Sequence, residues 1–139
     1  MLRKTALLVI SCDKYSDLWP IYFNSLFKYW PNCPLKIYLG SNFKKYDHKD
    51  VTMISIGEDS DYSSNLTAMI DKIEEEYLIT TVEDIFLSAP VDERNLLLYF
   101  QEFFDNNAAY LKLLNTFPVG YDKDTSKRTA SVASNVRYS

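Results

Sequence analysis

Short, mostly apolar runs recur along the chain and mark the segments that we expect to form strands. Four of them occupy residues 5–11, 35–40, 51–57 and 77–82. Runs of this length without polar alternation are typical of strands buried on both faces of a sheet. A fifth strand is expected over residues 108–115, AAYLKLLN. The pattern therefore predicts a sheet in the interior of the protein.

Three other segments carry apolar residues at the spacing of a helix. We expect helices over residues 17–30 and 61–77, and a third from Asp92 onward. Apolar residues three and four positions apart lie on one face of a helix, which can then pack on a sheet. Asp17 is the expected N-cap of the first helix. The expected caps of the second helix are Asp61, Ser63 or Ser64.

The order of these elements predicts an α/β fold. Strands alternate with helices except between residues 35–40 and 51–57, where the connection is too short and polar for a packed helix. Such alternation favours a mostly parallel sheet flanked by helices on both faces. Sheets of this class bind ligands outside the carboxyl ends of their strands. We therefore expect a functional site at that edge of the sheet.

Polar residues follow the first and fourth expected strands. Cys12, Asp13 and Tyr15 come after the first strand, and Glu83 and Asp84 follow the fourth. A carboxylate pair at the end of a buried strand is costly unless a cation, a hydrogen-bond network or water receives it. Because carboxylate oxygens suit Mg²⁺ and Mn²⁺, the pair is a candidate site for a divalent metal. We expect Asp13 and Asp84 to border one shared crevice.

Each of these clusters also has a purely structural interpretation. Glu83 and Asp84 can form a solvated turn or cap the segment that follows. Asp13 can hold the first turn, and Tyr15 can be an ordinary core or surface aromatic residue. A glycine-rich phosphate loop is excluded, because the chain has three glycines and none of the required spacings. A bound phosphate would need a metal ion or side chains.

Composition narrows the class of protein further. With 139 residues, 47% of them hydrophobic and 15% aromatic, the chain is long enough for one domain with a core. Its net charge of −4 provides no overall basic field, so nucleic acid is not an expected partner. Cys12, Cys33 and the single histidine, His48, show no zinc-ligand or disulfide-framework spacing. No apolar stretch approaches the ~20 residues of a transmembrane helix.

Two motifs stand within this order of strands and helices: DLWP at the start of the first expected helix and TTVEDIF at the end of the fourth strand. Over nearly the whole chain, the arrangement resembles the nucleotide-binding half of bacterial glycosyltransferases of the GT-A type. The resemblance implies a GT-A, Rossmann-like nucleotide-binding half. It also implies that Cys12, Asp13 and Tyr15 bind the base and ribose, that Ser64 and Asn65 lie near the diphosphate or sugar, and that Glu83 and Asp84 bind a Mn²⁺ or Mg²⁺ ion and the diphosphate.

The family implies an activity as well. Such an enzyme transfers a sugar from a nucleotide diphosphate to a glycan or lipid-linked acceptor in surface polysaccharide synthesis, in the cytoplasm or at the inner face of the membrane. The usual acidic signature of the family is Asp-x-Asp, where this chain has Val-Glu-Asp at residues 82–84. We expect the acceptor half and the catalytic base to lie outside this chain, which would then be a truncated product or a fragment.

The expected domain organisation follows from where the apolar pattern ends. Residues 1–121 are the predicted nucleotide-sugar-binding domain. Residues 122–139 carry no periodic apolar face, so we expect a flexible or incomplete segment, or one that rests on a neighbouring copy of the chain.

Two alternative functions belong to other classes. One is a truncated, non-catalytic α/β module that binds a nucleotide or a protein partner. The other is a receiver domain with Asp13 as its phospho-acceptor. That reading needs a lysine and a hydroxyl at the ends of later strands, and this chain does not have them there.

Overall fold

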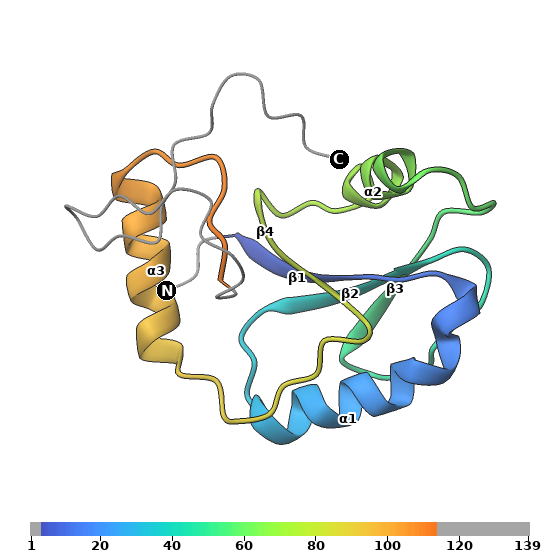
Figure 1. Ribbon diagram of the computed structural model, residues 1–139, viewed down its shortest axis with the longest axis horizontal. Helices are drawn as coiled ribbons and strands as arrows, with labels where there is room; N and C mark the ends of the chain where they lie inside the picture. Colours follow the sequence, from blue (N-terminus) through green and yellow to red (C-terminus); the bar gives the residue numbers. More distant parts are fainter. Residues whose placement is uncertain (1–3, 114–139) are drawn as a thin grey trace. The chain divides into compact units, whose positions relative to one another are not determined.

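A computed structural model describes residues 4–113 of the chain (Figure 1). The chain divides into two compact units, Met1–Val91 and Asp92–Ser139. The predicted boundary between residues 121 and 122, and the expectations for residues 122–139, lie outside the described residues.

The first unit is a parallel sheet with flanking helices, as the alternating pattern predicts. Its strands lie in the order β3-β2-β1-β4, and every neighbouring pair is parallel. No described helix has the length and apolar character needed to cross a membrane. In chain order the elements are β1 (Thr5–Ile10), the 3₁₀ helix η1 (Asp13–Leu18), α1 (Trp19–Tyr29), β2 (Lys36–Ser41), β3 (Val51–Ser55), α2 (Tyr62–Ile70) and β4 (Tyr77–Val82).

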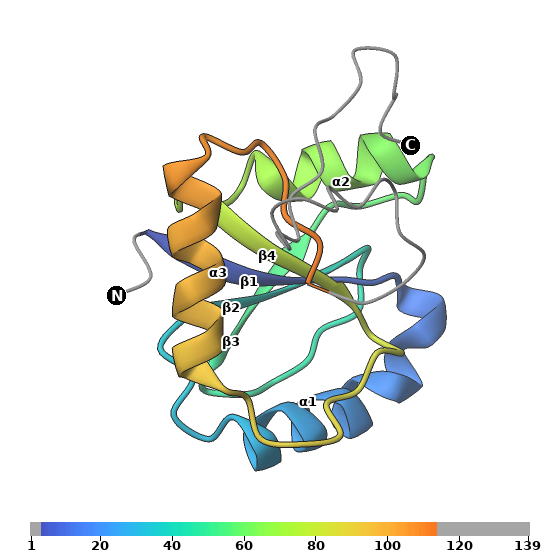
Figure 2. The same cartoon turned by 60° about the vertical axis from the view of Figure 1, so that its left-hand side comes forward.

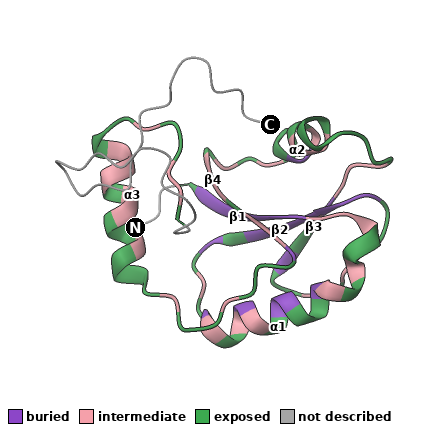
Figure 3. Cartoon of the chain, viewed as in Figure 1, coloured by how far each residue is buried: buried purple, intermediate pink, exposed green. Residues whose placement is uncertain are grey.

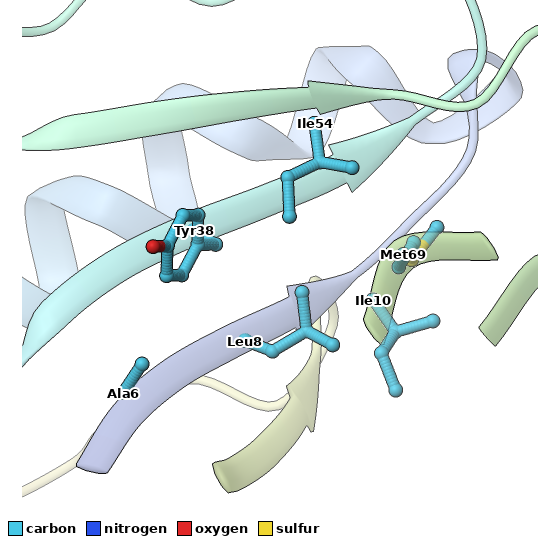
Figure 4. Close-up of a cluster of buried hydrophobic side chains, with 6 residues drawn as sticks. All are labelled: Ala6, Leu8, Ile10, Tyr38, Ile54 and Met69. Atoms are coloured by element: carbon cyan, nitrogen blue, oxygen red, sulfur yellow. The ribbon is translucent and has the colours of Figure 1, made fainter. Parts of the chain in front are cut away.

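The sheet lies between two helices, with α1 on one face and α2 on the other (Figures 1 and 2). β1 is buried along its whole length (Figure 3) because it is central in the sheet and covered on both faces. Successive side chains of a strand point to opposite faces. The cluster on the α2 face consists of Ala6, Leu8, Ile10, Tyr38, Ile54 and Met69 (Figure 4). On the other face of the sheet, α1 buries the side chains of Trp19, Tyr22, Phe23 and Leu26.

Gly40 allows α2 to approach the sheet closely. A Cβ atom at this position of β2 would overlap the side chain of Met69, including its sulfur atom. Met69 is 1% exposed and is the one buried residue of α2. A glycine within a strand often marks such a close approach, because any other residue would push the neighbouring element away. Gly40 therefore sets how deeply the Met69 side chain packs in the core.

Two details of the predicted helices in the first unit are corrected. Asp17 is not an N-cap: α1 is capped by Leu18 without a side-chain hydrogen bond. The reason is that η1 runs directly into α1, so the amide of Trp19 already donates to the carbonyl of Ser16. The second helix ends at Ile70, before the expected residue 77.

The early end of α2 has an electrostatic explanation. Three glutamates follow in the sequence at residues 74–76, and negative charge at the C-terminal end of a helix opposes its dipole. The chain instead leaves α2 through tight turns, in which the amides of Lys72 and Ile73 donate to carbonyls three residues earlier. Among the three expected caps, Asp61 is confirmed, because its carboxylate accepts a hydrogen bond of 2.9 Å from the amide of Ser64.

The second unit contains α3 (Glu93–Asp105), which confirms the helix expected from Asp92. The side chain of Asp92 caps it by accepting a hydrogen bond of 3.1 Å from the amide of Asn95. The strand expected over residues 108–115 is wrong over 108–113, which form no regular element, and its last two positions lie outside the described residues. An apolar run becomes a strand only when a neighbouring strand supplies backbone hydrogen bonds.

Candidate functional site

The carboxyl ends of three strands meet at one edge of the sheet. β1 lies between β2 and β4, and Ile10 pairs with Gly40 on one side and with Val82 on the other. From β1 the chain moves to β2 and then to β3 on one side of β1, and it later returns to form β4 on the other side of β1. Such a reversal is where open α/β sheets bind their ligands. The segments that follow β1, β2 and β4 therefore emerge side by side at the edge expected to hold a site.

Asp13 and Asp84 follow the neighbouring strands β1 and β4 rather than strands at opposite edges of the sheet. This part of the expectation is confirmed, and the shared crevice stays a prediction. The two carboxylates are in different surroundings. Asp13 is part of a dense hydrogen-bond network, whereas Asp84 is exposed.

The carboxylate of Asp13 is engaged by the segment after β2. It accepts hydrogen bonds from the hydroxyl of Ser41 at 2.8 Å and from the amides of Asn42, Phe43 and Lys44 at 3.0 to 3.3 Å. In return, the amide of Asp13 donates to the side-chain oxygen of Asn42 at 3.0 Å. Burial raises the pKa of Asp13, but the hydrogen bonds from Ser41 and the three amides outweigh it and hold the pKa below its ordinary value. Asp13 thus clamps the end of β2 to the end of β1.

Cys12 and Tyr15, the other residues predicted to hold a base and ribose, flank this clamp. Cys12 is half-buried and extended, and its carbonyl accepts a hydrogen bond of 3.1 Å from the amide of Tyr15. The side chain of Tyr15 is 44% exposed, with the amine of Lys14 5.7 Å from its ring centroid. Tyr15 is therefore available to a ligand, while Cys12 shapes the turn.

The side chains of Glu83 and Asp84 differ in their exposure to solvent. Glu83 is 7% exposed, whereas its neighbour Asp84 is open to solvent. Burial raises the pKa of Glu83 and the charge of Asp84 raises it further, while hydrogen bonds with its own backbone and with Ser11 lower it in part. The pair therefore combines a buried carboxyl group, whose ionisation is opposed by burial, with an exposed carboxylate.

Ser11 connects this acidic pair to the core. Its hydroxyl oxygen accepts a hydrogen bond of 2.8 Å from the indole nitrogen of Trp19, which is 2% exposed. The hydroxyl itself donates to the carbonyl of Cys12 at 3.4 Å, and the Ser11 side chain lowers the pKa of the Glu83 carboxyl group in part. Ser11 thus joins the end of β1 to α1.

Ser64 and Asn65, predicted to lie near a diphosphate or sugar, shape the start of α2. The hydroxyl of Ser64 donates to Asp61 at 2.6 Å, and the side-chain amide of Asn65 donates to Asp59 at 2.6 Å. The amide of Ser60 donates to the side-chain oxygen of Asn65 at 3.1 Å. Within residues 4–113 these hydrogen bonds are local to the turn before α2, and none joins it to the acidic pair. The ligand contacts expected of Ser64 and Asn65 stay predictions.

Metal binding would rest on the acidic pair. Among residues 4–113, no three His, Cys, Asp or Glu side chains are grouped closely enough to hold a metal ion by themselves. Glu83 and Asp84 supply hard oxygen donors of the type that Mg²⁺ and Mn²⁺ prefer, and Mg²⁺ commonly takes one or two carboxylates with substrate phosphates. The two carboxyl groups therefore fit an ion that is bound partly by the protein and partly by the oxygens of a diphosphate.

Three residues of this edge were not expected from the sequence: Ser11, Ser41 and Asn42. Ser41 is fully buried and Asn42 is 6% exposed. Polar side chains are buried to this extent when they have hydrogen-bond partners, and both side chains are bonded to Asp13. A signal was present, because the dipeptide Ser41-Asn42 interrupts an apolar run at the end of β2 as Ser11 does at the end of β1. Only the pairing of the two strands shows that these positions meet.

No protein-family model, curated protein or solved structure matches the chain.

Proposed function

We propose that this chain is the nucleotide-sugar-binding half of a GT-A-type glycosyltransferase. The donor would be a nucleotide-diphosphate sugar and the acceptor a glycan or a lipid-linked saccharide of surface polysaccharide synthesis. The reaction would then take place in the cytoplasm or at the inner face of the membrane.

One observation carries the proposal: an acidic pair directly follows β4, which lies beside β1 in an all-parallel sheet. Glu83 is held in the interior although burial opposes its charge. A carboxyl group kept in such a place costs stability, which is a common sign of a functional role. The neighbouring Asp84 is exposed and is therefore open to a ligand.

In this proposal, each residue at the carboxyl edge of the sheet has a separate role in binding a nucleotide diphosphate. Asp84 and Glu83 would hold a Mn²⁺ or Mg²⁺ ion, whose chemistry is to neutralise the charge of a departing diphosphate. Tyr15, partly exposed after β1, offers a ring face to a base or ribose. Asp13 contributes indirectly by holding the segment after β2 in place.

Calorimetric titration of the chain with UDP, GDP, CDP and dTDP, each with and without Mn²⁺, tests the proposal. We expect one nucleotide to bind and Mn²⁺ to strengthen its binding. Asp84→Asn should weaken the Mn²⁺-dependent binding tenfold or more, about 1.4 kcal/mol, because it removes a metal ligand. Its melting temperature should stay within about 2 °C of the parent's, since the lost carboxylate is exposed.

Glu76→Gln is the matched control. Glu76 directly precedes β4 and is exposed, so the variant removes the same charge at the opposite end of the same strand. Its ion pair with Lys4 at 3.3 Å is a surface pair of small energetic value. Nucleotide binding equal to that of the parent is expected. No binding of any nucleotide by the parent chain, or an equal loss in both variants, would contradict the proposed function.

A further inference from the structure

The acidic pair occupies the centre of a turn at the end of β4. The amide of Ile85 donates a hydrogen bond of 3.3 Å to the carbonyl of Val82, so Glu83 and Asp84 are the two residues between them. The entry to this turn is fixed by the pairing of β4 with β1. Its exit leads into residues 85–91, which form no regular element. The way this segment is held therefore decides how firmly the two carboxyl groups are placed.

The segment of residues 85–91, which we call the strap, is hydrogen-bonded to α1 at two points. The hydroxyl of Ser25 donates a hydrogen bond of 2.7 Å to the carbonyl of Leu87. At the end of the strap, the amide of Val91 donates to the carbonyl of Tyr29 at 3.1 Å. Tyr29 is the last residue of α1, and a helix leaves its final carbonyls without a partner of its own. The helix and the strap therefore satisfy each other's backbone groups.

The contacts with the strap lie along one face of α1. Residues 22, 25 and 29 are spaced three and four positions apart, which places them in a row on the helix surface. The ring of Tyr22 begins the row, with its centroid 6.5 Å from that of Phe86. Strap residues 86, 87 and 91 meet this row in the same order, and the strap runs beside α1 (Figures 1 and 2). α1 therefore supports the strap along its length.

We propose that Ser25 is a positioning residue for the metal and diphosphate site at Glu83 and Asp84. This inference rests on the proposed function, because it concerns the ion that the acidic pair would hold. The side chains of Glu83 and Asp84 repel each other when both are charged. The hydrogen bond of 3.3 Å that closes their turn is long, so it resists this repulsion weakly. Ser25 anchors the chain at Leu87, three residues after Asp84, and so restricts the movement of the turn.

Calorimetric titration of the full chain tests the role of Ser25, with UDP, GDP, CDP and dTDP as probes, each with and without Mn²⁺. Ser25→Ala should weaken the Mn²⁺-dependent binding by about three- to tenfold, because the loss of one hydrogen bond lets the metal ligands move. Binding of the same nucleotide without Mn²⁺ should be unchanged. A purely structural role would not separate these two affinities. Ser25→Thr keeps the hydroxyl and should restore the Mn²⁺-dependent affinity of the parent.

Ser88→Ala is the matched control. Ser88 lies in the strap beside Leu87 and is exposed, so the variant removes the same hydroxyl group and leaves the contact with α1 in place. Its nucleotide binding should equal that of the parent.

Hydrogen exchange provides a measurement that needs no ligand. The amides of Ile85 and Val91 close the turn and the end of the strap. Both should exchange faster in Ser25→Ala, by about three- to tenfold, because local opening becomes easier. Their exchange in Ser25→Thr and Ser88→Ala should match that of the parent.

The results distinguish a failed positioning role from a failed nucleotide site. If the parent binds nucleotide with Mn²⁺ and Ser25→Ala binds equally well, the positioning role alone is overturned. The same holds for an equal loss with and without Mn²⁺, a loss that Ser25→Thr does not restore or Ser88→Ala shares, or unchanged exchange at Ile85 and Val91. No nucleotide binding by the parent would overturn the proposed function, and the positioning role with it.

Discussion

The hydroxyl of Ser41 donates a hydrogen bond of 2.8 Å to the carboxylate of Asp13, and this contact joins the last residue of β2 to the segment that follows β1. Ser41 is fully buried, and three backbone amides converge on the same carboxylate. The amides of residues 42–44 have no strand partner because β2 has ended, and the carboxylate of Asp13 accepts their hydrogen bonds instead. The carboxyl edge of the sheet is shaped by this residue before any ligand arrives.

Asp13→Asn should destabilise the protein by about 1 to 2 kcal/mol, because the oxygen that becomes an NH2 group no longer accepts from the amide of Phe43 and the negative charge that strengthens the other hydrogen bonds is lost. The free energy of urea unfolding measures the effect. Asp47→Asn, a change of an exposed aspartate in the loop between β2 and β3, is the control and should alter stability by less than about 0.5 kcal/mol.

The same variant has a defined pH dependence. The pKa of Asp13 is lowered in the fold, so its contribution to stability is present above the ordinary value of 3.8 and is lost as the pH falls through the folded-state pKa. The difference between the parent and Asp13→Asn should therefore be largest at neutral pH and should shrink in acid. A difference that grows in acid would show that Asp13 is not held as a carboxylate.

Glu83→Gln should raise the melting temperature at neutral pH. The pKa of Glu83 is raised mainly by burial, so the fold favours the neutral form. The contribution of the neutral Glu83 to the free energy of unfolding is fully present below the ordinary pKa of 4.5. This contribution is lost as the pH rises through the pKa of the folded state. Calorimetric melting at pH 7 and in mild acid checks this, with the gain expected to vanish in acid. A lower melting temperature of the variant at neutral pH would mean that Glu83 stabilises the fold as an anion.

Tyr22→Phe should protect the protein at alkaline pH. Burial is the main cause that raises the pKa of Tyr22 to about 12, with a further increase from Cys33 and a partial decrease from a hydrogen bond with Thr81. The parent should lose about 2 to 3 kcal/mol of stability as the pH rises from 10.0 toward 12, because the unfolded tyrosine ionises first. Unfolding free energies of both proteins across this range provide the measurement. Parallel curves for parent and variant would contradict the assignment.

Gly40→Ala should destabilise the protein by about 1 to 3 kcal/mol, because its new methyl group overlaps Met69. Met69→Ala alone should cost about 2 to 5 kcal/mol through the cavity that it leaves in the core. In the double variant the methyl group occupies part of that cavity, so its cost should be at least about 1 kcal/mol below the sum of the single costs. Urea unfolding of the four proteins in this cycle gives the coupling, and additive costs would show that the two residues do not interact.

The sequence by itself determined the four strands of the first unit and the existence of its two α-helices. Each strand is a short apolar run bounded by polar residues, and each helix carries apolar residues at helical spacing. These are local properties, since the period of the side chains follows from the backbone of each element. The position of Asp13 and Asp84 at the carboxyl edge also follows from the sequence, because they come directly after strands of a parallel sheet.

Only the tertiary structure decided what these residues touch. β4 lies beside β1 and not beside β3, and this arrangement brings the residues that follow β1 and β4 to neighbouring positions at the carboxyl edge. Glu83 is buried and Asp84 exposed although they are adjacent, because neighbouring side chains leave the backbone in different directions and meet different surroundings. The engagement of Asp13 by residues 41–44 likewise depends on hydrogen bonds between segments far apart in the chain. Residues 108–113, apolar as they are, form no strand, because strand formation requires a partner that their own sequence does not supply.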